Sequence, residues 1–134
     1  FQSGGFYIQD PGTLLAPSLV GARPGERVLD LCAAPGGKTA ILAQAMLNKG
    51  TLTAHDDSAE RLELLRDNVR RLGLDCVRIE PDRAQVERLA PFDRILVDAP
   101  CSNTGVLRRR VDARWRFSEN ELDSLRATQQ SLLD

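Results

Sequence analysis

The sequence has few of the features that mark metalloproteins, disulfide-rich secreted proteins and membrane proteins. Its 134 residues contain one histidine and three cysteines. No two cysteines have the C-x-x-C spacing of a zinc site, so we expect no metal ion. The absence of paired cysteine spacings indicates reduced thiols and a reducing compartment. No apolar run approaches the roughly 20 residues that span a membrane, and no charged-then-apolar leader opens the chain. These absences predict a cytoplasmic protein, or a domain of one, without a membrane partner.

The overall charge does not point to a nucleic-acid partner either. The formal net charge is -1, and 42% of the residues are hydrophobic while 28% are charged. This balance is ordinary for a globular protein, and the length suits one domain with a hydrophobic core. Any affinity for RNA must therefore come from local clusters of basic residues.

Hydrophobic periodicity and turn residues predict strands and helices in alternation. Residues 1–9 are expected to be extended or irregular. Strands are expected at residues 27–32, 51–55, 76–80 and 92–98, and helices at residues 11–20, 38–48, 57–72, 84–89 and from 118 to the end. The last strand carries Ile95-Leu96-Val97, which is typical of a strand buried on both faces. Such alternation predicts an α/β fold with a parallel sheet and helices on both faces.

Several helical positions are predicted to share one face. The first helix would group Leu14, Leu15 and Leu19, the second would turn Ile41, Leu42, Ala45 and Met46 inward, and the third would align Leu62, Leu65, Val69 and Leu72.

The first strand runs into a Pro-Gly-Gly turn and then a helix start, within residues 28–39. Backbone N–H groups and the helix dipole can face a ligand at such a junction, and Gly36 and Gly37 let the backbone approach it closely. We infer a nucleotide-like ligand here; a tight turn without a ligand is the alternative. A P-loop for a triphosphate would need glycine where Cys32 stands, and the G-x-G-x-x-G pattern of dinucleotide sites is absent.

Carboxylates follow the second and third predicted strands, where ligands bind in open parallel sheets. Asp56 is placed to accept hydrogen bonds from ribose hydroxyls, with helix capping as the alternative. Asp57, three residues before Glu60, fits the N-cap of the next helix. Asp82 could reach the exocyclic amine of an adenine, or could be a turn residue after Pro81. Together with the glycine turn, these positions favour an adenosine group.

The fourth predicted strand is followed by Asp98-Ala99-Pro100-Cys101. A thiol at this place is positioned for chemistry on a substrate in the cleft. The alternative is a buried inert cysteine, but Pro100 favours a rigid loop, so we predict a functional Cys101. Cys32 and Cys76 fall on predicted strands and are expected in the core.

Five arginines and one aspartate fall within residues 108–116, with Trp115 among them. Phosphate contact combined with base stacking uses this composition. The alternative is a solvated surface whose arginines pair with Glu119 and Glu121. The predicted RNA-binding residues are Arg108, Arg109, Arg110, Arg114 and Trp115.

From about Phe6 onward the chain resembles the catalytic domain of the Sun/NOL1/NOP2 (RsmB-like) family of RNA 5-methylcytosine methyltransferases. Residues 29–39 and 98–105 carry the resemblance, and residues 9–11 and 112–115 support it. It implies a Rossmann-like class I methyltransferase fold, present here without its C-terminal strands, that uses S-adenosylmethionine. Bacterial members methylate ribosomal RNA, which is therefore the expected partner. Arg110-Val111 departs from the His-Pro common in relatives.

The resemblance also implies residue roles. Residues 32–38 would wrap the methionine and ribose of the cofactor, Asp56 would hold the ribose with Arg61 nearby, Asp82 would meet the adenine, and Asp98 would lie by the methyl group. The implied cofactor-binding residues are Cys32, Ala33, Ala34, Pro35, Gly36, Gly37, Lys38, Asp56, Arg61, Asp82 and Asp98.

The implied chemistry needs a thiol because cytosine C5 is a poor nucleophile. A thiolate that adds to C6 makes C5 enamine-like, and Asp98 could hydrogen-bond the ring. In the family the attacking thiol lies in a later Thr-Cys-Ser motif and the Pro-Cys thiol, here Cys101, assists breakdown of the adduct; in DNA cytosine methyltransferases the Pro-Cys thiol itself attacks. The sequence contains no Thr-Cys-Ser stretch, so we expect these residues alone to bind cofactor without methylating RNA. The rival hypotheses are a non-catalytic RNA-binding module and a P-loop NTPase.

Overall fold

The computed structural model describes residues 2–102 and 118–133. It divides into two compact units, residues 1–98 and residues 99–134, which are described separately below.

The first unit is built on a parallel sheet of four strands. These are β1 (Arg27–Asp30), β2 (Thr51–Ala54), β3 (Val77–Ile79) and β4 (Arg94–Leu96), in the order β3-β2-β1-β4. Leu29 of β1 is in register with Thr53 of β2 on one side and with Ile95 of β4 on the other. The predicted parallel sheet is confirmed, although its strands are shorter than the sequence suggested.

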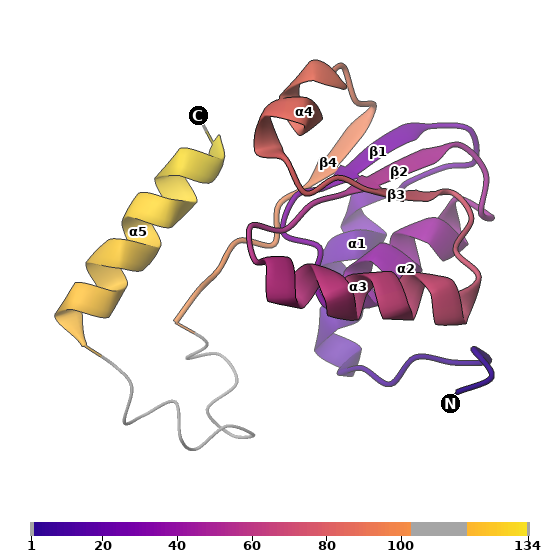
Figure 1. The fold of residues 1–134 in the computed structure, drawn as a ribbon, viewed down its shortest axis with the longest axis horizontal. Helices are drawn as coiled ribbons and strands as arrows, with labels where there is room; N and C mark the ends of the chain where they lie inside the picture. The colour runs from indigo at the N-terminus through magenta and orange to yellow at the C-terminus, as the bar shows by residue number, and fades with distance from the viewer. Residues whose placement is uncertain (1, 103–117, 134) are drawn as a thin grey trace. The chain divides into compact units, whose positions relative to one another are not determined.

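Helices cover both faces of this sheet, as predicted. A 3-10 turn, η1 (Pro11–Leu14), leads into α1 (Leu15–Val20), and α2 (Gly37–Ala45), α3 (Ala59–Leu72) and α4 (Arg83–Arg88) connect the strands. Figure 1 shows α4 across the sheet from α1, α2 and α3. The reason is the strand order: the chain steps outward from β1 to β3 and then returns past β1 to β4. Because parallel crossovers are right-handed, reversing the direction moves the connecting helix to the opposite face.

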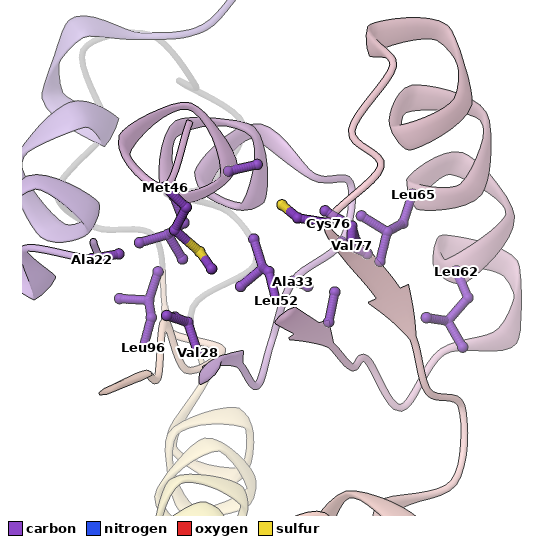
Figure 2. Close-up of a cluster of buried hydrophobic side chains, with 14 residues drawn as sticks. Ala22, Val28, Ala33, Met46, Leu52, Leu62, Leu65, Cys76, Val77 and Leu96 are labelled. Carbon is purple, nitrogen blue, oxygen red and sulfur yellow. The ribbon is translucent and has the colours of Figure 1, made fainter. Parts of the chain in front are cut away.

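The core lies between the sheet and helices α2 and α3 (Figure 2). Its largest fully buried apolar side chains include Leu42, Met46, Leu52, Leu65 and Val28. The predicted inward face of α3 is confirmed, with Leu62 and Leu65 buried and Val69 packed against the same cluster.

Three predictions about apolar positions are wrong. Leu14, Leu15 and Leu19 are 43%, 65% and 78% exposed, because the first helix is split into η1 and α1 and turns Pro17 inward instead. Ala45 is exposed at the end of α2. Ile95 is 54% exposed while Leu96 is buried, so β4 is buried on one face only in the described part of the chain; successive strand residues point to opposite faces.

The second unit contains α5 (Glu119–Leu133). Ser118 Oγ accepts a hydrogen bond from the Glu121 N–H at 3.2 Å, which confirms the predicted cap. Gln129 donates to the Pro100 carbonyl at 2.7 Å. Among the described helices of the chain, none has the length and apolar character needed to cross a membrane.

Candidate functional site

A pocket of about 220 Å³ opens beyond the carboxyl ends of β1 and β4. In the sheet, β2 and β3 follow on one side of β1, and β4 lies on the other side. The gap between the ends of β1 and β4 is therefore the topological switch point, where open α/β sheets bind ligands. The pocket is lined by Tyr7, Ile8, Gln9, Thr13, Cys32, Ala33, Ala34, Pro35, Gly37, Lys38 and Asp98. Seven of the predicted cofactor residues are therefore brought together.

Neighbouring side chains pack closely against both glycines of residues 33–37, the glycine loop, which the sequence did not reveal. Gly36 has φ of +107°, and a Cβ there would lie 2.9 Å from Leu65 Cδ1. A Cβ on Gly37 would lie 2.9 Å from Gln9 Oε1 and 3.1 Å from Tyr7 Cε1. The loop is thus pressed between α3 beneath it and the N-terminal segment beside it.

The glycine loop delivers the chain into α2 with an open helix N-terminus. Gly36 is the N-cap, and no side chain caps this end. The first N–H groups of a helix have no partner within the helix, and the helix dipole there favours negative charge. The first turn of α2 is therefore suited to an anionic group of a ligand in the pocket.

Asp30, the last residue of β1, lies fully buried beneath this first turn. Its Oδ2 accepts a hydrogen bond from Thr39 Oγ1 at 2.7 Å, while its Oδ1 has no hydrogen-bond partner. Burial raises the pKa of Asp30 to about 6, against the lowering effects of the Thr39 hydrogen bond and the Lys38 charge. The carboxyl group of Asp30 therefore changes its charge near pH 6 rather than near pH 3.8.

Lys38 and Asp98 form an ion pair that joins the start of α2 to the end of β4. Their side chains are 22% and 47% exposed, so the pair lies at the mouth of the pocket. The lysine that a P-loop would direct at phosphate is here paired with a carboxylate.

Asp56 and Arg61 hold the glycine loop from the β2 side. Asp56 is buried, and its Oδ2 accepts from the Ala34 N–H at 3.2 Å and lies 3.3 Å from Arg61 Nη2. Its Oδ1 accepts from the Ser58 N–H at 3.1 Å, and Arg61 donates to the Ala34 carbonyl at 2.5 Å. Neither residue lines the pocket, so a contact with ribose stays a prediction.

The predicted cap of α3 is wrong by one position. Ser58, directly before the helix, is the N-cap and accepts from the Arg61 N–H at 3.3 Å. Asp57 instead lies 3.1 Å from Nε2 of His55, whose Nδ1 lies 2.8 Å from the Glu80 carbonyl. The buried His55, which the sequence reasoning overlooked, thereby links the ends of β2 and β3.

Asp82 is the N-cap of α4, where it accepts a hydrogen bond from the Ala84 N–H at 2.9 Å. Asp82 therefore caps a helix, a role that the sequence reasoning, which gave a turn residue as the alternative, did not assign to it. A contact with adenine remains a prediction.

The three cysteines have different surroundings. Cys76 is buried, as predicted. Cys32 is not on a strand, because β1 ends at Asp30; it is half-buried and lines the pocket. Burial, with nearby carboxylates led by Asp56, raises the pKa of Cys32 to about 11, so this thiol stays protonated and is unsuited to nucleophilic attack. Cys101 belongs to the second unit, where it is exposed.

The predicted RNA-binding residues Arg108, Arg109, Arg110, Arg114 and Trp115 lie outside the described residues. Conversely, the pocket contains Tyr7, Gln9 and Thr13, which the sequence reasoning did not assign to it. The one available signal was Gln9-Asp10-Pro11, which supported the family resemblance without a role.

Comparison with known proteins identifies the family of this fold and pocket. A family model described as 16S rRNA methyltransferase RsmB/F matches residues 17–134. Ribosomal RNA small subunit methyltransferase B of Pseudomonas syringae pv. tomato is 41% identical over 137 aligned residues, which cover 100% of this chain and 31% of that protein.

Two solved structures support the same assignment. The crystal structure of PH0851 has a TM-score of 0.92 and 35% identity over 99% of this chain and 31% of its own. The NSun6 structure from Pyrococcus horikoshii, solved with SFG, has a TM-score of 0.69 and 35% identity over 76% of this chain and 27% of its own. This chain therefore spans less than a third of these relatives, and the predicted class I methyltransferase fold is confirmed. The chain belongs to the 16S rRNA methyltransferase RsmB/F family.

Proposed function

We propose that these residues form the cofactor-binding part of an S-adenosylmethionine-dependent RNA (cytosine-5-)-methyltransferase that acts on small-subunit ribosomal RNA. The observation that carries the proposal is the pocket between the ends of β1 and β4, in a chain of this family. A cytoplasmic location, as the sequence predicts, would agree with that substrate.

The residues present fit S-adenosylmethionine. The pocket of about 220 Å³ is smaller than the roughly 300–1,000 Å³ of sites that enclose a whole drug-sized ligand, so it would take one end of the cofactor. The methionine end would lie there, against the glycine loop, while the adenosine would extend over β2 and β3 toward Asp56 and Asp82. SFG, an analogue of S-adenosylmethionine, in the NSun6 structure supports the same assignment.

The cofactor would supply the methyl group, and the protein would orient the cytosine. Asp98 would accept a hydrogen bond from the cytosine, and its ion pair with Lys38 would fix the carboxylate at the pocket mouth. Cys101 would assist release of the product, and arginines 108–110 and 114 would contact the RNA backbone. The sequence contains no Thr-Cys-Ser stretch, so the 134 residues alone should bind cofactor and transfer no methyl group.

The test uses the full-length gene product that carries these residues, with tritiated S-adenosylmethionine and unmodified 16S rRNA. We expect label at cytosine C5, loss of label with Asp98→Ala, and a covalent protein–RNA complex that survives denaturing electrophoresis with Cys101→Ala. Failure of the wild-type protein to bind S-adenosylhomocysteine in calorimetry would refute the proposal.

The rival functions give different results in the same experiments. A non-catalytic RNA-binding module would bind RNA in a salt-dependent way that Asp56→Ala leaves unchanged. A P-loop NTPase would bind ATP with Mg²⁺, whereas here the lysine directly after the glycine loop, Lys38, is paired with Asp98.

A further inference from the structure

Two buried oxygens stand out around the first turn of α2. Within the described part of the chain, Gln9 Oε1 and Asp30 Oδ1 are the buried side-chain polar atoms that have no hydrogen-bond partner. Both are hydrogen-bond acceptors. A buried acceptor without a partner costs about 1–3 kcal/mol, so this pattern is expected where a ligand supplies the missing donor.

Gln9 is placed at the pocket rather than merely near it. Its side chain lines the pocket, and Oε1 lies 2.9 Å from where a Cβ of Gly37, the first residue of α2, would stand. No described protein group, Lys38 included, donates a hydrogen bond to this oxygen. The oxygen is buried, and a ligand that lies against the N-terminus of α2 would reach it through a small rotation of the Gln9 side chain.

The segment that carries Gln9 is anchored on both sides. Before it, Arg71 of α3 donates to the Phe6 carbonyl at 3.0 Å. After it, Asp10 caps η1 by accepting from the Gly12 N–H at 2.7 Å. An acceptor held between two fixed points is preorganised, which lowers the entropy cost of binding.

The combination of an amide oxygen and an open helix N-terminus fits a free α-amino acid group. The helix N-terminus favours the carboxylate, the amide oxygen accepts from the ammonium, and both groups sit on one carbon of the ligand. Asp30, buried beneath the same turn, adds acidic character that favours a cation.

We propose that Gln9 recognises the amino-acid end of the cofactor, with Oε1 accepting a hydrogen bond from the α-ammonium group of its methionine. The inference rests on the proposed function, since it names a residue for the same site. It makes Gln9 a specificity-determining residue for ligands that carry a free amine.

The test is calorimetry on the full-length gene product with three ligands. S-adenosylhomocysteine carries the whole amino-acid end, decarboxylated S-adenosylmethionine carries the amine alone, and 5′-methylthioadenosine carries neither group. Gln9→Leu, which keeps the size but removes the acceptor, should weaken the first two ligands about 10- to 100-fold, as expected for a hydrogen bond to a charged group. Binding of 5′-methylthioadenosine should change less than about twofold.

Two further variants make the result specific. Gln9→Glu keeps the acceptor and should retain the affinity for S-adenosylhomocysteine, which also provides the test if Gln9→Leu folds poorly. Gln44→Leu, the same change at an exposed position of α2, should leave all three affinities unchanged.

The outcomes separate this inference from the proposed function. Wild-type protein that binds neither S-adenosylhomocysteine nor 5′-methylthioadenosine overturns the proposed function. Equal weakening of all three ligands by Gln9→Leu overturns the inference alone, because Gln9 would then only shape the pocket. Unchanged cofactor affinity with a raised KM for RNA also overturns it, because the oxygen would then face the cytosine amine.

Discussion

The ends of β1 and β2 lie side by side in the sheet, yet the oxygens around them are in opposite states. Both oxygens of Asp56, after β2, are held by protein donors on the glycine loop and on the start of α3. Asp30 and Gln9, around the end of β1, each keep one buried oxygen without a partner. The difference indicates two roles. Asp56, at the end of β2, holds the glycine loop in place and is called the brace below, while Gln9 and Asp30, around the end of β1, keep acceptors for a ligand.

The largest effect is expected from removing the brace. Asp56→Ala leaves the Ala34 and Ser58 N–H groups without their acceptor and Arg61 without its charge partner. We expect the free energy of unfolding to fall by about 2–3 kcal/mol. The affinity for S-adenosylhomocysteine should fall at least about tenfold, because one hydrogen bond to a charged group contributes about that factor to binding. Urea unfolding and calorimetry measure the two effects.

A matched control is Asp67→Ala, which removes an exposed carboxylate of α3 that lies 3.5 Å from Nη1 of the equally exposed Arg70. It should change stability by less than about 0.5 kcal/mol. Equal stability of the two variants would contradict the role assigned to Asp56.

The second effect concerns the loop that Asp56 braces. Gly36→Ala places a Cβ 2.9 Å from Leu65 Cδ1 at a residue with φ of +107°. We expect about 1–3 kcal/mol of destabilisation, because a side chain is strained in this backbone region. Gly5→Ala is the control, since a Cβ there meets nothing within 4 Å. Identical unfolding midpoints for the two variants would show that the loop tolerates a side chain.

The sequence predicted the sheet and the glycine loop better than it predicted the contacts of Asp56, which was expected to bind ribose or cap a helix, or the N-terminal side of the pocket. The alternation of apolar strands with capped helices was enough to predict a parallel sheet. The expectation that ligands bind beyond the carboxyl ends of the strands correctly placed Asp98 beside the glycine loop. Tyr7 and Gln9 were overlooked because irregular segments have no periodicity, and only the folded chain shows that they pack beside Gly37. The cap of α3 was misplaced because Asp57 and Ser58 are both good capping residues and are adjacent, so a one-residue shift decided between them.

The third effect tests the acidic group at the β1 end through pH. Burial raises the pKa of Asp30 from 3.8 to about 6, so the folded state binds the proton more tightly than the unfolded state. The stabilisation is therefore complete below pH 3.8 and is lost as the pH rises through about 6. Between pH 5 and pH 7 we expect this group alone to lower the free energy of unfolding by about 1 kcal/mol.

Urea unfolding of the wild type and of Asp30→Asn at both pH values isolates the effect, because other titrating groups contribute to both proteins. The variant should lose about 1 kcal/mol less between pH 5 and pH 7. Parallel pH profiles would mean that Asp30 titrates alike in the folded and unfolded states.

The smallest effect separates ligand binding from folding at the β1 end. Gly37→Ala would place a Cβ 2.9 Å from Gln9 Oε1 and 3.1 Å from Tyr7 Cε1. The tip of Gln9 can move, and alanine suits a helix better than glycine, so we expect stability to change by less than about 0.5 kcal/mol. Affinity for S-adenosylhomocysteine should fall about 3- to 10-fold through the displaced hydrogen bond.

This prediction can be sharpened with a double variant, because the added methyl group could act through Gln9 or by filling the pocket. If it acts through Gln9, Gly37→Ala has no further effect on S-adenosylhomocysteine affinity once Gln9→Leu is present, and the two changes are non-additive. If the two losses add, the methyl group excludes the ligand directly. In that case the glycine at 37 is required by the cofactor itself, which is the reason that the sequence first suggested for it.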